Sequence, residues 1–332
     1  MRINLYLILG FFVFQQGFGQ LRPEIQNLVT EISDYGGLTS EFIGYAGNQS
    51  PQYLRCMLLD SIATESELIF LTEHKSPVVR CAAFPSLCKK NVELSTQILY
   101  KHLFDNKIVL VQSGCVGSDR SVADDFIGSY IYILTEKDSV IPTKNREYKT
   151  KLDHLILENS LISLRYKTHL IRTLELNKKN YAIVKKIALQ AKEPEAIIAL
   201  AKYHNKKDKN IIVKAFGNEK LEIGAIRATK EFPESDFFPF LVKIFESDFV
   251  KSKNDYDKWR LLYQTIAKFP NEPKTIELFE RTFTRDKELR KPMEEYLWMA
   301  ITKYPNPNFE IFKPKLNVDE NNIFLLEERD FD

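Results

Sequence analysis

The chain has 332 residues, of which 44% are hydrophobic and 28% are charged, with only 12 Gly and 14 Pro. This is the balance of an ordinary globular protein, and the length suffices for two compact domains or one array of repeats. The net charge is +2, so the charge of the whole molecule does not predict a class of partner.

The first twenty residues have the three-part layout of a secretory signal peptide. Arg2 supplies a positive charge, residues 5–14 are apolar apart from one glycine, and Gly-Phe-Gly precedes Gln20. The apolar run is about ten residues long, well short of the roughly 20 that span a bilayer. We therefore predict a signal peptide over residues 1–19, cleavage between Gly19 and Gln20, and a secreted or periplasmic chain without a membrane span. The Phe-Gly-Gln ending resembles exported proteins of the Bacteroidota.

Residues 20–50 are expected to form an N-terminal cap made of a short helix and a loop. Apolar residues spaced by three and four predict the helix up to Tyr35, and the glycines and polar residues that follow predict the loop. A new helix is expected near Pro51. Thr64 and Glu67 then have the spacing of a capping box, which predicts the start of the next helix.

Residues 67–91 predict two helices separated by a tight break at Lys75, Ser76 and Pro77. Ser76 is an N-cap candidate, and Pro77 then occupies the first helical position, where a missing N–H loses no bond. The order Val-Val-Arg-x-Ala-Ala-x-x-x-Leu that follows resembles the second helix of a HEAT repeat. The resemblance implies an α-solenoid, in which helix pairs stack side by side, and it specifies neither a partner nor a reaction.

The helical pattern breaks after residue 105, where a β-branched run precedes two glycines that flank Cys115. One interpretation is a binding loop with a reactive Cys115 beside Asp119 and Arg120. The other is a connection between repeats, with glycines that serve turn geometry and a cysteine that packs inward. The lack of a nearby histidine base favours the connection. Ser118 is expected to cap the next helix.

The chain contains four cysteines, at positions 56, 81, 88 and 115. An even number in an exported protein is typical of disulfides. However, Cys81 and Cys88 lie seven residues apart on one predicted helix, about 10 Å along its axis, which is too far for a bond. Buried free thiols and one cross-helix disulfide therefore both stay open. No Cys-x-x-Cys pair occurs, so no zinc site is expected.

The C-terminal third gives the clearest sign of repeats. Glu231-Phe-Pro, Lys268-Phe-Pro and Lys303-Tyr-Pro recur, and the steps from 231 to 268 and from 268 to 303 are 37 and 35 residues. The residues ahead of each share the same offsets, which places each set on one helical stripe. The stripes are Leu221, Ala225, Ala228 and Phe232; Lys258, Leu262, Thr265 and Phe269; and Met293, Leu297, Ala300 and Tyr304.

A period near 36 with two helices per unit predicts an all-α solenoid, a right-handed superhelix of about six to eight helix pairs. The signatures of tetratricopeptide and ankyrin repeats are absent, so HEAT-like or armadillo-like units fit best. We assign the repeats to residues 51–306 and a closing cap with an acidic tail to residues 307–332.

Positive charge is concentrated in the middle of the sequence. Residues 144–220 hold 18 Lys and Arg against 8 Asp and Glu, a net of +10, whereas residues 1–143 and 221–332 each carry a net of −4. A basic centre can hold an anionic glycan, a lipid headgroup or an acidic protein, or it can simply be solvated surface. The candidate binding lysines are Lys178, Lys179, Lys185 and Lys186.

The sequence lacks the common catalytic signatures, including Gly-x-Ser-x-Gly, His-Glu-x-x-His and phosphate-binding glycine loops. We therefore expect a non-catalytic scaffold of the cell envelope, without cofactor or metal, that binds a protein or an anionic envelope polymer along its concave face. Nucleic acid is not expected, because no aromatic-basic motif occurs. The alternatives are a thiol-dependent enzyme site around Cys115, since some HEAT-like proteins act as lyases, and a structural spacer in an envelope assembly.

Overall fold

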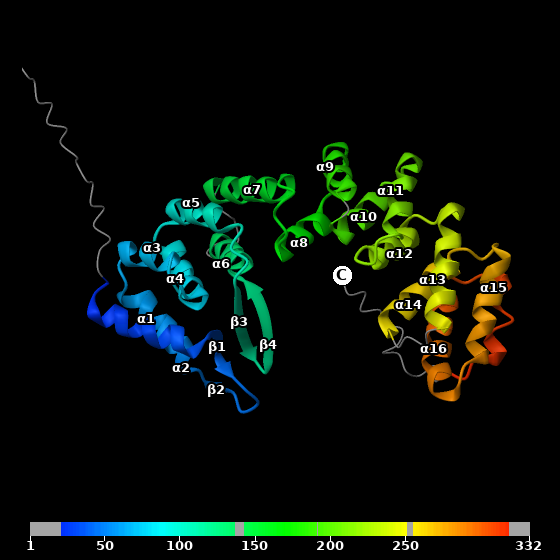
Figure 1. Ribbon diagram of the computed structural model, residues 1–332, viewed down its shortest axis with the longest axis horizontal. Coiled ribbons are helices and arrows are strands. Elements are labelled where there is room, and N and C mark those ends of the chain that lie inside the picture. The colour runs from blue at the N-terminus through cyan, green and yellow to red at the C-terminus, as the bar shows by residue number, and fades with distance from the viewer. Residues whose placement is uncertain (1–20, 137–142, 191, 251–254, 319–332) are drawn as a thin grey trace, which may run out of the picture. The chain divides into compact units, whose positions relative to one another are not determined.

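The computed structural model describes residues 21–136, 143–190, 192–250 and 255–318. These residues are mostly helical and belong to two compact units (Figure 1). Unit 1 comprises residues up to 155 together with 164–166, and unit 2 comprises residues 156–163 and those from 167 onward. The predicted cleavage site lies outside the described residues. Within them, no helix combines the length and the apolar character needed to cross a bilayer.

The helices of unit 1 are α1 (Pro23–Tyr35), α2 (Pro51–Ile62), α3 (Glu65–Thr72), α4 (Pro77–Lys90), α5 (Val92–His102), α6 (Val122–Glu136) and most of α7 (Thr143–Glu158). Helices α1 to α4 begin close to the predicted positions. The capping box is confirmed, because Thr64 Oγ1 accepts from the Glu67 N–H at 3.3 Å and the Glu67 carboxylate accepts from the Thr64 N–H at 2.9 Å. Helix α1 ends at Gly36, whose φ of 81° suits glycine.

Helix α4 starts at Pro77 as predicted, but the side chain of Ser76 makes no capping bond. A buried arginine holds this end of the helix instead. Arg80 donates to the His74 carbonyl oxygen at 2.7 Å and pairs with Asp105 at 3.0 Å. The arginine of the HEAT-like motif therefore ties the first turn of α4 to the segment that follows α5.

Unit 1 also contains a four-stranded sheet, which corrects the all-α expectation. Its strands are β1 (Gly37–Ile43), β2 (Asn48–Gln49), β3 (Ile108–Gly114) and β4 (Val116–Ser121), in the order β2-β1-β3-β4. Strands β1 and β3 are parallel, and the other two pairs are antiparallel. The segment expected as the loop of the N-terminal cap thus holds two strands. The β-branched residues of β3 favour this structure, and Val109 is fully buried.

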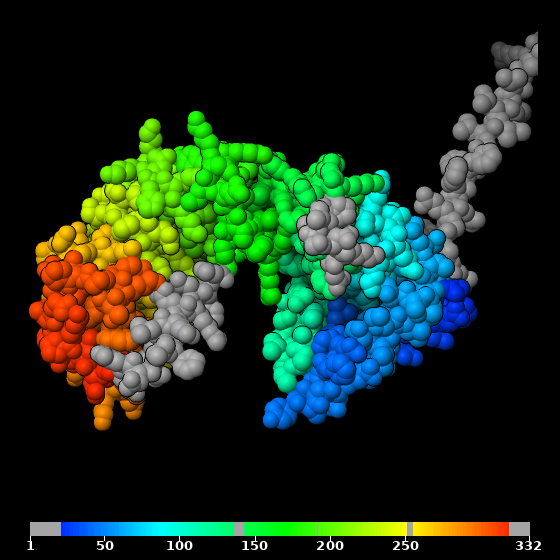
Figure 2. Space-filling view, turned by 180° about the vertical axis from the view of Figure 1, so that it is seen from behind, coloured from blue at the N-terminus to red at the C-terminus, as the bar shows by residue number. Residues whose placement is uncertain are grey.

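The expected loop around Cys115 is the β3–β4 hairpin, which extends from the helices of unit 1 (Figures 1 and 2). The prediction that Ser118 caps the next helix is wrong, because Ser118 lies within β4. Ser121 has that position instead, and its hydroxyl accepts from the Asp124 N–H at 3.0 Å. The chain stays extended for three more residues because each residue of β4 is paired with β3.

The described part of unit 2 is built from helices. They are most of α8 (Arg165–Thr173), α9 (Lys178–Leu189), α10 (Pro194–Ala201), α11 (Lys209–Ala215), α12 (Glu222–Glu231), α13 (Phe238–Val250), α14 (Tyr256–Ala267), α15 (Pro273–Glu280) and α16 (Lys287–Lys303). The three predicted stripes lie on α12, α14 and α16 and at their ends. All their residues are buried except Tyr304, which is half-buried. Helices α10, α12, α14 and α16 each pack on the next in that order, so they form one layer.

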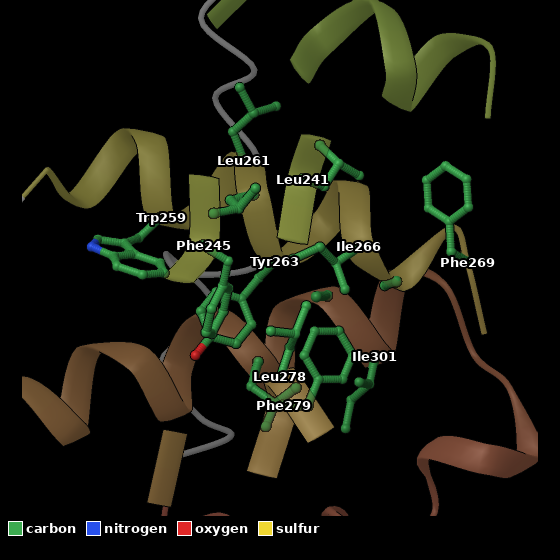
Figure 3. Packing of buried hydrophobic residues seen from close by; sticks show 14 of the residues in the cluster. Leu241, Phe245, Trp259, Leu261, Tyr263, Ile266, Phe269, Leu278, Phe279 and Ile301 are labelled. Carbon is green, nitrogen blue, oxygen red and sulfur yellow. The ribbon is translucent and has the colours of Figure 1, made fainter. Parts of the chain in front are cut away.

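Aromatic side chains fill the core between α13, α14 and α15 (Figure 3). Tyr263 is fully buried, stacks on Phe279 with ring centroids 5.6 Å apart, and shares a 2.6 Å hydrogen bond with Thr282. Beyond α16, Phe309 and Phe312 insert into the same cluster from single 3-10 turns. These two rings close the end of the core. The acidic tail from residue 319 lies outside the described residues.

Candidate functional site

A groove with a volume of about 370 Å³ crosses the helix layer of unit 2. Helix α10 contributes Glu195, Ile198 and its C-cap residue Lys202. Helix α12 contributes Ile223, Arg227 and Lys230. Helix α14 contributes a third row of side chains, and Arg172 of α8 completes one end. The site is therefore built from one face of three neighbouring helices.

The helical period places this row of side chains opposite the core. At about 100° per residue, Ile223, Arg227 and Lys230 fall within about 60° of one another and about half a turn from the core stripe of α12. On α14, Arg260 and Gln264 have the same relation to the core stripe of that helix. The spacing that buries one face of each helix thus leaves the groove side chains in line on the other.

Contacts at both ends show that α12 and α14 run in the same direction. Near their starts Lys258 Nζ lies 2.5 Å from Glu222, and near their ends Lys230 Nζ donates to Gln264 at 3.4 Å. The first turn of α10 packs closely on α12, because a Cβ added to Gly224 would lie 2.9 Å from the Pro194 Cβ. The first turns of the three helices therefore lie side by side.

The lining of the groove is mostly charged and includes three aliphatic residues. Ile198 and Leu261 are each only 9% exposed, whereas Ile223 is 38% exposed, so Ile223 offers most of the aliphatic surface to a ligand. Apolar contact area beside polar groups is a common feature of binding pockets. The arrangement can hold a segment that has both aliphatic and charged parts.

Some charges of the groove are already satisfied within the protein. Arg172 pairs with Glu195 at 2.9 Å. Lys258 is 9% exposed and lies 2.5 Å from both Glu222 and Asp248. These pairs link neighbouring helices and contribute to the fold, because removing one partner of a buried pair leaves a charge without compensation.

Two cations of the groove have no such partner. Lys202 and Arg227 are half-buried, and neither side chain makes an ion pair or hydrogen bond with the part of the chain that the structure describes. A half-buried cation interacts more strongly with an anion than one in open water, because the effective dielectric constant is lower. These two residues are the strongest candidates for contact with a ligand.

The structure does not bring Cys115, Asp119 and Arg120 together. Cys115 is exposed in the tight turn between β3 and β4. Asp119 and Arg120 are successive residues of β4 and point to opposite faces of the sheet. Arg120 faces the helices, with Asp125 of α6 at 3.9 Å. This arrangement supplies Cys115 with neither a base nor an anion-stabilising group from these residues.

The four cysteines are free thiols in the structure, so the disulfide alternative has no support. Burial raises the pKa of Cys56 to about 11 and that of Cys88 to about 12. Burial also raises the pKa of Cys81 well above its ordinary value. These three side chains are poor nucleophiles at neutral pH, because the thiolate is the reactive form.

The four candidate lysines lie on α9 and outside the groove. Lys178, Lys179 and Lys186 are exposed, whereas Lys185 pairs with Asp208 at 2.7 Å and lies over the Tyr181 ring. Lys185 thus has a structural contact. The basic segment as a whole is divided between the two units, and it also supplies the groove with Lys202.

Inspection of the sequence did not single out the groove, although the repeat register contains the signal. Positions two and six residues after the first core residue of each stripe are Ile223 and Arg227 on α12, and Arg260 and Gln264 on α14. Each pair lines the groove. Catalytic motifs and runs of charge are features of one continuous stretch, so they do not detect residues that are spread over several helices.

Within the described ranges, no three His, Cys, Asp or Glu side chains are grouped so that they could hold a metal ion. Comparisons with models of protein families, with curated proteins and with solved structures found no match for the chain. The functional assignment therefore rests on the chemistry of the groove and on the repeat register.

Proposed function

We propose that this protein is a non-catalytic binding scaffold of the cell envelope that holds a partner segment in the groove across α10, α12 and α14. The groove itself carries the proposal. It combines aliphatic surface with two cations, Lys202 and Arg227, that have no partner among the described residues. Binding sites commonly combine apolar contact area with a few charged groups that fix orientation.

A HEAT-like solenoid, with a right-handed superhelix over residues 51–306, is part of the same proposal. The common register of the three stripes, the shared direction of α12 and α14, and the packing of α10 on α12 support it. Repeat arrays present one helix of each pair on an extended binding surface. The location in the envelope follows from the signal-like residues 1–19.

The size of the groove suits an extended segment. Neighbouring helix axes are spaced by about 8–10 Å, so three helices extend over about 16–20 Å. A strand-like segment rises about 3.3 Å per residue, so about five to six residues cross the groove. This length is typical of short linear motifs in partner proteins, and the groove side chains of the three helices can contact the whole of such a segment.

Capture of partners from an envelope extract tests the proposal. Residues 20–332 are immobilised as the wild type, as Ile223→Trp, which fills the groove, and as Leu189→Trp, which adds the same ring at an exposed position of α9. We expect the wild type and Leu189→Trp to retain the same partner and Ile223→Trp to lose it. Equal capture by all three would exclude the groove, and no capture by any would favour the structural spacer.

A further inference from the structure

We infer that the ligand of this groove is an acidic peptide segment, with one carboxylate between Lys202 and Arg227 and an aliphatic side chain on Ile198 and Ile223. The inference rests on the proposed function and adds the chemistry of the ligand and the residues that anchor it. It also chooses between a protein partner and an anionic envelope polymer.

The positions of the two cations define the carboxylate site. Lys202 is the C-cap residue of α10, and Arg227 lies in the second half of α12. The two helices pack on each other, and both side chains line the same groove. An arginine guanidinium can bind a carboxylate through two parallel hydrogen bonds, and a nearby lysine adds a third donor.

The neighbouring surface determines what flanks the carboxylate. Ile198 precedes Lys202 by one helical turn, and Ile223 precedes Arg227 by one turn, so an isoleucine lies beside each cation. Both isoleucines line the groove. A ligand residue next to the carboxylate therefore meets aliphatic surface, which favours Leu, Ile or Val at that position.

The acidic residues of the groove argue against a polyanion. Glu231, Asp255 and Asp257 line the same groove, and a uniformly charged polymer that crosses all three helices would lie close to them. Each like-charge contact weakens binding. A segment with one carboxylate and otherwise neutral residues satisfies the two cations and brings fewer negative charges near these residues, so a peptide fits better than polyphosphate or a sulfated glycan.

Selection from a phage-displayed library of random heptapeptides tests the inference. The targets are the wild type, Lys202→Ala/Arg227→Ala, and Lys178→Ala/Lys186→Ala as a control that removes the same charge from exposed positions of α9. We expect the wild type and the control to enrich peptides with Asp or Glu next to Leu, Ile or Val. The groove variant should lose this enrichment. Enrichment of basic peptides, or the same acidic peptides on the groove variant, would overturn the inference.

Fluorescence anisotropy with an enriched peptide then measures the anchor directly. Replacing the peptide Glu by Gln, or Arg227 by Ala, should each weaken binding by about tenfold or more, because a hydrogen-bonded charge pair is lost. Once Arg227 is absent, the Glu→Gln change should have a much smaller effect, since the two changes remove the same contact. Independent, additive effects would contradict the pairing. If polyphosphate bound more tightly than the peptide and the Arg227→Ala variant lost this binding, an anionic polymer would be favoured instead.

The two proposals fail in different ways. If Ile223→Trp abolishes partner capture while Lys202→Ala/Arg227→Ala retains it, the scaffold stands and the acidic anchor is wrong. If neither variant affects capture, both proposals are wrong. Circular dichroism of each variant shows whether its helices are intact, and Arg227→Lys, which keeps the charge, should fall between the wild type and Arg227→Ala.

Discussion

The contact between α10 and α12 predicts an unusual effect of a single methyl group. In a helix interior, Gly→Ala normally stabilises by about 0.5 to 1 kcal/mol. At Gly224, however, the new Cβ would lie 2.9 Å from the Pro194 Cβ and 3.0 Å from the Pro194 carbonyl oxygen. Both atoms belong to a rigid ring or to the backbone, so they cannot move aside as a flexible side chain would.

The clash should outweigh the gain in helix propensity. Overpacking of this kind costs about 1 to 3 kcal/mol, and Gly224 is the third residue of α12, where the propensity gain is small. We expect Gly224→Ala to destabilise unit 2 by about 1 kcal/mol and to separate α10 from α12. Lys202 and Arg227 would move apart, so peptide binding should weaken as well.

Gly128 provides the matched control. It is an exposed residue inside α6, and no atom lies within 4 Å of an added Cβ. Gly128→Ala should therefore stabilise unit 1 by about 0.5 to 1 kcal/mol. Hydrogen exchange measured by mass spectrometry separates the two effects, because it reports α6, α10 and α12 individually even if the units unfold separately.

The expected result is faster exchange in α10 and α12 for Gly224→Ala and slower exchange in α6 for Gly128→Ala. If both substitutions slow exchange locally, α10 and α12 do not approach each other as described. The groove between these two helices would then also differ from the one described.

Three further predictions concern other contacts. Lys258→Met should destabilise unit 2 by about 3 to 5 kcal/mol in urea unfolding, because the buried carboxylate of Asp248 loses its cation, and Asp248→Asn in the same chain should restore part of the loss. In the folded protein iodoacetamide should modify Cys115 and leave Cys81 and Cys88 unmodified until denaturant is added, and Cys115→Ser should leave partner capture intact; modification of Cys81 or Cys88 in the folded protein would contradict their burial. Hydrogen bonding to Arg22 lowers the pKa of Glu67 from 4.5 to about 2, so this contact stabilises unit 1 fully above about pH 4.5 and is lost as the pH falls toward 2. Glu67→Gln should therefore flatten the dependence of stability on pH within that window.

The helices could be predicted because their signals are local. Thr64 and Glu67 cap each other within one turn, and Pro77 fixes the start of its own helix. The stripes of α12, α14 and α16 each follow the helical period, and their repetition places the helices in one register. Caps and apolar spacings of this kind lie within one helix, so they can be recognised without knowing which segments pack together.

The sheet could not be predicted in the same way, because its pairing is not local. Gly37 in β1 pairs with Leu110 in β3, and helices α2 to α5 lie between them in the chain. The strands are short, and β4 is mostly exposed, so alternation of buried and exposed residues is weak. The β-branched run of β3 indicated a break in the helices, but its partner lies in a segment whose glycines read as a loop.

The groove could not be predicted for a related reason. Its residues occupy equivalent positions of several helices, but they differ in residue type. At the core positions α12, α14 and α16 keep an apolar or small residue, apart from the ion-paired Lys258, because the neighbouring helix must fit against it. At the opposite positions the residue changes freely, from Ile223 on α12 to Arg260 on α14 and Glu295 on α16. A repeat layer can therefore change the charge along its exposed face without disturbing its core. In the proposed scaffold, specificity for one partner is encoded by differences between the repeats, and these differences are not part of the pattern that the repeats share.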